Sequence, residues 1–225
     1  MRFERKMPTP GEGKILVQCD FDGTVTEEDI SFLILDAFAD GDWRQLLTQY
    51  REKRISVGFF NTRAFTMVKE DEEILNQFAR ERFELRAGFR RLIEYCREKE
   101  FRFVIVSNGL DFYIRMILET VGLADVEVYA AQTCFGTNGV EARYLGPKGN
   151  ELQDDFKKAY VRHFLKEGYR MVYVGNGDSD IPSARLAHHV FATGQLLEYY
   201  KAKSLDCTPF TEFNDVVNGL ELLEW

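Results

Sequence analysis

Two aspartates two residues apart, Asp20 and Asp22, are the side chains best suited to chemistry in this chain. A short apolar run at 15–19 precedes them, and Gly23 and Thr24 follow. Such a run is typical of a buried parallel strand opening into a loop, where open α/β sheets bind their ligands. Crowded carboxylates repel each other unless a cation or proton lies between them. The pattern indicates a metal site, an acid/base role or both, although two surface aspartates starting a turn would give the same letters.

A carboxylate in this position could act as a nucleophile. Asp20 could attack phosphorus and hold the phosphoryl group as an acyl phosphate. Asp22 would protonate the leaving oxygen and then deprotonate the attacking water. Gly23 permits a tight turn, and the Thr24 hydroxyl can hydrogen-bond within that turn.

Three later positions could complete such a site. Ser107 ends a second apolar run, and a hydroxyl followed by exposed N–H groups suits an anionic oxygen. Asn176 and Asp180 follow a third run, and their oxygens could complete a shell around Mg²⁺. Lys157 or Lys158 could offset the negative charge of a phosphate. A capping serine, a polar loop and a solvated lysine pair are the ordinary alternatives, but their combination at successive strand ends favours phosphoryl chemistry.

The elements that must position these residues alternate along the chain. We expect strands at 15–19, 101–107, 126–130, 171–175 and 190–192, and helices at 89–98, 112–121, 156–166 and 181–186. This alternation predicts an α/β fold: a three-layer, Rossmann-like, doubly wound parallel sheet with right-handed crossovers. Asn138-Gly139 predicts a hairpin turn between 132–136 and 140–145.

Residues 29–83 break the alternation and show no strand signal. They predict four short helices, at 29–39, 42–51, 56–68 and 71–83, with N-caps at Asp29, Asp42, Ser56 and Asp71. We therefore expect a small all-helical cap inserted after the first strand, above the carboxyl edge of the sheet. The expected division is a core domain of 14–26 and 84–225 and a cap domain of 27–83.

Composition narrows the class of protein. The 225 residues carry a net charge of −8, from 29 basic and 37 acidic residues, so no domain-wide basic surface is expected for nucleic acid. The four cysteines are scattered without metal-ligand spacing, and no run is long enough for a membrane span. We expect a soluble cytoplasmic protein, with a monomer and a homodimer both open.

These residues together resemble the haloacid dehalogenase superfamily of phosphatases over 14–217. Residues 20–26 match its first motif, 107–109 its Ser/Thr motif, and 175–180 its final acidic motif. Lys157 matches the family lysine better than Lys158, because its distance to the final motif fits. An insert directly after the first motif resembles the helical cap of phosphoserine-phosphatase-like members.

The resemblance implies the chemistry of the site. Asp20 becomes phosphorylated, Asp22 serves as acid and base, Ser107 and the Asn108 amide hold phosphoryl oxygens, and Lys157 steadies the intermediate. The implied cofactor is Mg²⁺. Its implied ligands are Asp20, the Asp22 carbonyl and Asn176, which stands where the family usually has aspartate, with Asp180 supporting the same site.

The partner that this implies is a small phosphorylated metabolite. Thr24, Asn108, Gly109 and Asp29 are the expected substrate-binding residues. Asp29 could read an amine or hydroxyl, although helix capping is its simpler role. Because an amide binds a hard cation less tightly than a carboxylate, we expect Asn176 to weaken Mg²⁺ affinity without abolishing activity.

Within the family, segments 86–90, 107–112 and 209–213 are most similar to phosphatases of the methionine-salvage enol phosphate. Asn108 replaces the second glycine of their Ser-Gly-Gly turn, and a plain hairpin replaces their cysteine-rich stretch. Phosphoserine, phosphocholine and phosphoethanolamine remain open as substrates. A weakened relative that only binds a phosphorylated ligand is the non-enzyme alternative, and Asn176 is its only support.

Overall fold

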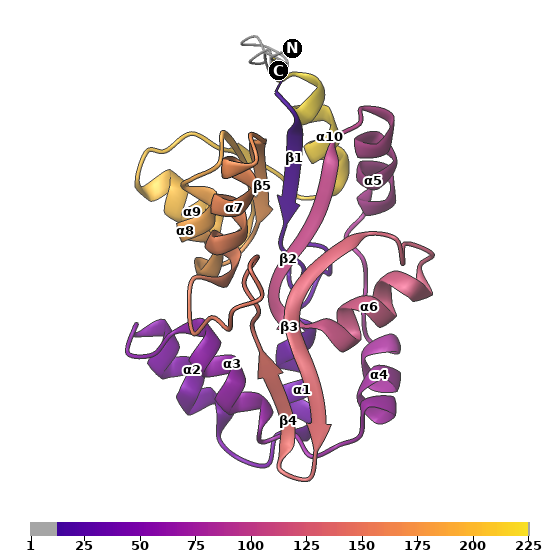
Figure 1. The fold of residues 1–225 in the computed structure, drawn as a ribbon, viewed down its shortest axis with the longest axis vertical. Coiled ribbons are helices and arrows are strands. Elements are labelled where there is room, and N and C mark those ends of the chain that lie inside the picture. Colours follow the sequence, from indigo (N-terminus) through magenta and orange to yellow (C-terminus); the bar gives the residue numbers. More distant parts are fainter. Residues whose placement is uncertain (1–12, 225) are drawn as a thin grey trace, which may run out of the picture.

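A seven-stranded sheet with helices on both sides forms the centre of residues 13–224, the part of the chain that the computed structural model describes (Figure 1). Its strands are β1 Ile15–Cys19, β2 Arg102–Leu110, β3 Glu127–Gly136, β4 Gly139–Arg143, β5 Arg170–Gly175, β6 His189–Ala192 and β7 Thr208–Pro209. They lie in the order β4-β3-β2-β1-β5-β6-β7, and only the β3–β4 pair is antiparallel. The expected doubly wound α/β class is confirmed.

The central strand delivers Asp20 to the middle of the sheet edge. All five residues of β1 are buried, and β1 pairs in parallel with β2 on one side and with β5 on the other. The strand order therefore reverses at β1, which is where open α/β sheets leave a crevice for ligands. The loops after β1, β2 and β5 must meet at that crevice.

The helices of the sheet layers are α5 Phe89–Glu98, α6 Asp111–Thr120, α7 Phe156–Lys166, α8 Ile181–Ala184, α9 Gly194–Ala202 and α10 Phe213–Glu221, with a 3₁₀ turn at Asp178–Asp180. Figure 1 shows α5 and α6 on one side of the sheet and α7 and α8 on the other. The sequence patterns did not predict α9, β7 or α10. Within residues 13–224, none of the helices has the length and apolar character that a membrane crossing requires.

Four helices between β1 and α5 confirm the predicted helical insert: α1 Ile30–Phe38, α2 Trp43–Arg51, α3 Val57–Phe65 and α4 Glu72–Arg80. Asp29, Asp42 and Ser56 accept the expected capping bonds from backbone N–H groups. Asp71 stands at the N-cap of α4, but its side chain makes no capping bond.

The hairpin differs from the expectation in one respect. We expected separate strands at 126–130 and 132–136, whereas β3 runs unbroken through both and turns at the predicted Asn138-Gly139 into β4. The hairpin reaches beyond the sheet to the insert, where the Val140 N–H donates to the Val68 carbonyl at 3.1 Å (Figure 1). β3 pairs with β2 in its first half and with β4 in its second half, and β4 packs against α3.

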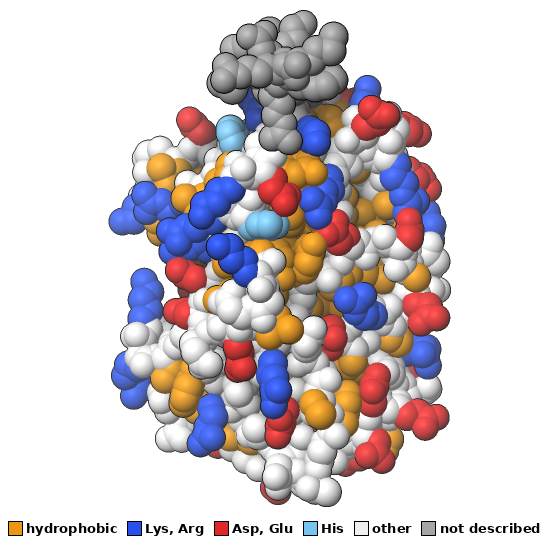
Figure 2. Space-filling view, in the orientation of Figure 1, with side chains coloured by type: hydrophobic (Ala, Val, Ile, Leu, Met, Phe, Trp, Pro, Cys, Tyr) orange, Lys and Arg blue, Asp and Glu red, His pale blue; other side chains and the backbone are white. Residues whose placement is uncertain are grey.

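On the molecular face in Figure 2, acidic and basic side chains are interspersed over the sheet layers and the helical insert. The mixture agrees with the modest net charge of −8. Such surfaces are typical of globular proteins that do not rely on one dominant charge.

Candidate active site

Asp20 is fixed at the carboxyl end of β1 with one oxygen unbound. Its N–H donates to the Val174 carbonyl at 2.9 Å, which extends the pairing with β5 by one residue. Its Oδ1 accepts the Phe21 N–H at 2.7 Å and lies 2.8 Å from Lys157 Nζ. Its Oδ2 receives no hydrogen bond from residues 13–224. The carboxylate is therefore oriented through one oxygen and has the other available for a reaction.

Lys157 lies in the first turn of α7 and is 3% exposed. Its Nζ is 2.7 Å from Asp180 Oδ1, and its carbonyl accepts the Gln18 Nε2 hydrogen bond at 3.2 Å, which ties α7 to β1. The neighbouring Lys158 instead pairs with Asp155 on the surface. The two adjacent lysines thus have opposite environments, and only Lys157 contacts Asp20.

Burial and neighbouring charges shift the pKa values of the two carboxyl groups that contact Lys157, Asp20 and Asp180. Burial raises the pKa of the Asp20 carboxyl to about 7, and repulsion from Asp180 adds to the rise while Lys157 opposes it. Burial also acts to raise the pKa of Asp180, but attraction to Lys157 outweighs it and the pKa is lowered. A cation beside Asp20 would favour its ionised form. The site therefore has more negative charge than Lys157 balances.

Asp180 is enclosed by donors on both carboxylate oxygens. Tyr173 Oη donates to Oδ1 at 2.7 Å, alongside Lys157, and the N–H groups of Asn176 and Gly177 donate to Oδ2 at 3.0 and 2.9 Å. The side chain has no exposed surface. In this arrangement Asp180 positions Lys157 and the loop after β5, and a role as direct metal ligand stays a prediction.

The loops after β1 and β5 are locked together. Thr24 Oγ1 donates to Asn176 Oδ1 at 3.0 Å, so the predicted substrate-binding threonine is buried and contacts the other loop. Gly23 has a φ of +69°, and a Cβ there would lie 2.3 Å from Asn176 Nδ2. Arg86 donates to the Gly23 and Thr24 carbonyls at 3.0 and 2.9 Å. Position 23 therefore requires glycine for two reasons: the positive φ of its backbone and the close approach of the Asn176 side chain.

Asp22 has a donor on each carboxylate oxygen. The Ile30 N–H donates to Oδ1 at 3.0 Å, and Tyr113 Oη donates to Oδ2 at 2.5 Å. Burial, and then repulsion from Asp29, raises the pKa of Asp22 to about 8. At neutral pH a substantial fraction of Asp22 therefore carries a proton, which suits a general acid.

Asp29 serves first as a helix cap. Its Oδ1 accepts the Phe32 N–H at 2.9 Å, and the side chain also lines the same cavity as Asp20 and Asp22. Burial raises the pKa of Asp29 to about 6. Its contact with a substrate stays a prediction.

Ser107 lies where the pairing of β2 with β3 breaks. The strand continues to Leu110, but its register shifts between Val106 and Leu110, so the intervening backbone leaves the ladder. The Gly109 N–H donates to Ser107 Oγ at 3.0 Å. The hydroxyl proton of Ser107 is then left for another acceptor. Gly109, expected to bind substrate, instead uses its N–H inside the loop, and substrate contact by Gly109 stays a prediction.

The carbonyl of Asn108 is held by two side chains that the sequence reading missed. Asn61 Nδ2 from α3 donates to it at 2.8 Å, and Tyr144 Oη donates at 2.6 Å. Asn61 is a single amide among the apolar residues of its helix, and such an isolated buried polar group signals a specific partner. No comparable signal marks Tyr144, because a tyrosine among other apolar residues is ordinary in a protein core.

A cavity of about 390 Å³ lies over these groups. Asp20, Asp22, Ser107, Asn108, Lys157 and Asn176 line its floor, together with Gly23, Gly109, Gly177, Asp178 and Ser179. An apolar wall faces them from the helical insert: Phe32, Leu47, Tyr50, Val57 and Phe60. The structure therefore brings together the predicted residues of four separate loops.

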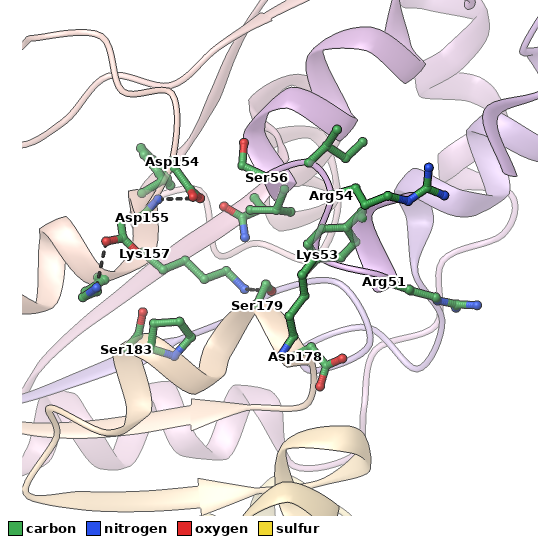
Figure 3. A pocket seen from close by; sticks show the side chains of 17 residues that line it. Arg51, Lys53, Arg54, Ser56, Asp154, Asp155, Lys157, Asp178, Ser179 and Ser183 are labelled. Carbon is green, nitrogen blue, oxygen red and sulfur yellow. Dashed lines mark hydrogen bonds and ion pairs between the residues drawn. The ribbon is translucent and has the colours of Figure 1, made fainter. Parts of the chain in front are cut away.

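A second pocket of about 450 Å³ adjoins this cavity and shares Lys157, Asn108 and Asp178 with it. Figure 3 shows Lys53 reaching from the end of the α2 segment towards Asp178, while Lys157 points to Ser179 from the other side. The basic side chains of Lys53, Arg54 and Lys158 also line this second pocket.

The donor set at the floor fits a hard cation. The Asp20 carboxylate, the Asp22 carbonyl and the Asn176 amide offer oxygen atoms, and Mg²⁺ usually binds few protein groups and keeps several waters. Within residues 13–224 no cluster of three or more His, Cys, Asp or Glu side chains is arranged around a metal position. This is consistent with Asp180 turning to Lys157, which leaves two neutral oxygens and one carboxylate.

Comparison with known proteins identifies the family. The haloacid dehalogenase-like hydrolase family matches residues 17–185, most of the chain and every loop of the site. The chain belongs to this family.

Its relatives include enzymes with a defined substrate. It is 30% identical to the 2-hydroxy-3-keto-5-methylthiopentenyl-1-phosphate phosphatase of Geobacillus kaustophilus over 94% of this chain and 97% of the relative. The enzyme of the same name from Brevibacillus brevis is 26% identical over 94% of this chain and 97% of the relative. A phospho-aspartyl intermediate analogue of phosphoserine phosphatase shares the fold, with a TM-score of 0.69, 17% identity and coverage of 92% and 99%.

Proposed function

We propose that this chain is a Mg²⁺-dependent phosphomonoester hydrolase that acts on a small metabolite through a phosphoaspartate on Asp20. One observation carries the proposal: Asp20 is anchored through Oδ1 and keeps Oδ2 free, in a cavity that Asp22 also lines. An anchored nucleophile with an adjacent acid is the arrangement that covalent phosphoryl transfer requires.

In the first half of the reaction, Asp20 Oδ2 attacks phosphorus and forms the acyl phosphate. The ester P–O bond breaks, and the leaving oxygen takes the proton of Asp22. Lys157 and Ser107 offer a cation and a hydroxyl donor to the negative charge of the phosphoryl group.

In the second half, water attacks the phosphoaspartate. Asp22, now ionised, takes a proton from this water, the bond between phosphorus and Asp20 breaks, and inorganic phosphate leaves. Asp22 regains the proton it lost, so the cycle closes with ester and water consumed and alcohol and phosphate formed.

Mg²⁺ would be held by Asp20, the Asp22 carbonyl and Asn176, and when bound it would neutralise charge on the phosphoryl oxygens. The nucleophile must be ionised, and the pKa of Asp20 in the protein alone is about 7. This supports a need for a cation beside Asp20. Asp180 acts from behind, through Lys157 and the loop after β5.

We infer that residues 27–83 act as a cap domain over a core of 14–26 and 84–225. The apolar wall of the cavity comes entirely from this segment, which supports a substrate with an apolar end. Apart from Lys157, the described lining of the cavity has one cation, Arg51, and Lys157 already pairs with Asp20 and Asp180.

This lining favours 2-hydroxy-3-keto-5-methylthiopentenyl-1-phosphate, the substrate named for the relatives, because its methylthio end is apolar and uncharged. Phosphoserine would place a carboxylate and an ammonium group against a largely apolar wall. Phosphocholine or phosphoethanolamine would place a cation there. The cationic substrates find their best support in Glu27 and Asp29, two acidic residues that line the cavity. The four free cysteines support a reducing, cytoplasmic location.

A phosphate-release assay over these four esters and p-nitrophenyl phosphate, with Mg²⁺ and with EDTA, tests the proposal. We expect the methylthio ester to have the highest kcat/KM and Asp20→Asn to remove turnover of every ester. Binding of an ester without release of phosphate would favour the non-enzyme alternative.

A further inference from the structure

Tyr113 contacts the proposed general acid directly, although no motif of the site includes it. It lies in the first turn of α6 and is completely buried. Its Oη donates to Asp22 Oδ2 at 2.5 Å, and Ser31 Oγ from α1 lies 2.8 Å from the same Oη. When Asp22 is ionised it can only accept, so the single Tyr113 proton points to Asp22 and Ser31 supplies the proton of the second bond.

The surrounding chain is shaped for this contact. A Cβ at Gly109 would lie 2.0 Å from Tyr113 Oη and 2.3 Å from Asp22 Oδ2, so any side chain there would displace the pair. The Tyr113 ring packs against Phe112 edge-to-face at 5.3 Å and against Phe21 at 6.4 Å. The ring and the hydroxyl are therefore held in place independently of Asp22.

The two donors fix the carboxyl plane of Asp22. The Ile30 N–H holds Oδ1, and Tyr113 holds Oδ2. Without the second donor, the carboxyl could rotate about its Cβ–Cγ bond while it kept the first. A proton donor has to reach the leaving oxygen at hydrogen-bond distance, so such rotation costs rate.

We propose that Tyr113 is a positioning residue that holds the Asp22 carboxyl in the orientation required for protonation of the leaving group. The inference rests on the proposed function. Tyr113 itself neither gains nor loses a proton in the step: the Asp22 O–H bond breaks, the leaving oxygen gains that proton, and the ester P–O bond breaks as the Asp20–phosphorus bond forms.

Two esters of nearly equal shape separate positioning from general damage. Phenol holds its proton far more tightly than p-nitrophenol, so phenyl phosphate needs the acid and p-nitrophenyl phosphate hardly does. The ratio kcat/KM reports only steps up to the first irreversible one, the formation of phosphoaspartate. For Tyr113→Phe we expect kcat/KM on phenyl phosphate to fall about 10- to 100-fold, because Asp22 becomes charged as it gives up its proton and the hydrogen bond from Tyr113 strengthens in the transition state. On p-nitrophenyl phosphate we expect a loss of less than about threefold.

Matched variants make the result specific. Tyr160→Phe removes another buried tyrosine hydroxyl, which donates to the Leu145 carbonyl, and should change neither ester. Ser31→Ala removes only the outer hydrogen bond and should give a smaller loss with the same preference. If Tyr113→Phe does not fold, the ester preference of Ser31→Ala tests the same role of Tyr113. Asp22→Asn should show the same ester preference in stronger form.

The outcomes are distinguishable. Equal losses on both esters in Tyr113→Phe, or no loss on phenyl phosphate, would overturn the role of Tyr113 and leave the proposed function intact. A wild-type protein that hydrolyses neither aryl ester nor the metabolite esters would overturn the proposed function and the inference together.

Discussion

The floor and the wall of the cavity are built by opposite principles. On the floor, Asp20 and Lys157 are buried charges, and Asp180 lies behind Lys157; the three pair at 2.7–2.8 Å. On the wall, the side chains from α1, α2 and α3 are mainly apolar. The floor stands on strand ends and a helix start, which hold charged groups rigidly, whereas the apolar side chains of the wall come from the helical insert and make none of the hydrogen bonds of Asp20, Asp22 and Lys157. The difference suggests that the floor determines the reaction and the wall selects the substrate.

Removing the nucleophile should give the largest effect on the floor. Asp20→Asn leaves a neutral amide that cannot form the acyl phosphate, and we expect kcat to fall by at least about 10⁴-fold. Phosphate release measured on the best ester checks this, with thermal unfolding as the control for folding. Full activity of this variant would remove the nucleophile assignment.

Asp22→Asn should come next. The amide cannot donate or accept the transferred proton, so both half-reactions slow, by about 10²–10⁴-fold in kcat. Rapid-quench kinetics should show slower formation and slower breakdown of the phosphoenzyme. A change in only one of these two rates would contradict the double role.

The adjacent lysines Lys157 and Lys158 test whether only the buried one contributes to catalysis. Lys157→Met leaves Asp180 and Asp20 without their buried cation, so we expect about 10²–10³-fold lower kcat and a loss of about 3–5 kcal/mol in unfolding free energy. Lys158→Met is the matched control, since its partner Asp155 lies at the surface, and should change kcat less than about twofold. Similar effects of both changes would contradict the assignment.

A change on the wall should alter selectivity and spare the chemistry. Phe32 lines the cavity and packs against Trp43 and Phe60. We expect Phe32→Ala to lower kcat/KM for the methylthio ester about tenfold, the scale of lost apolar contact in a binding pocket. Acetyl phosphate, which has no long tail, should be hydrolysed at nearly the wild-type rate. A comparable loss on both substrates would show that the wall also organises the floor.

The smallest effect concerns the metal. Asn176→Asp adds a negative charge to the oxygen set, and we expect the Mg²⁺ concentration for half-maximal activity to fall about threefold to tenfold. A Mg²⁺ titration of activity, joined to calorimetric Mg²⁺ binding, measures it. Unchanged or weaker binding would contradict a ligand role for Asn176.

Local signals explain what could be predicted in the fold. The apolar run of β1, the caps of α1 to α3 and the Asn138-Gly139 turn each depend on a few neighbouring residues, and each appears where the sequence indicates it. The helices α9 and α10 and the short strand β7 were not predicted. The two-residue β7 is too short for a periodic pattern, and its pairing with β6 depends on residues outside it.

The sequence alone determined which groups the strand ends would carry, because strand and loop patterns are local and a parallel sheet brings its carboxyl ends to one edge. Only the tertiary structure decided what each group touches. Asp180 faces Lys157, Tyr113 holds Asp22, and Asn61 reaches Asn108 across 47 positions of the chain. Such contacts depend on packing between distant elements, and no spacing along the chain records them.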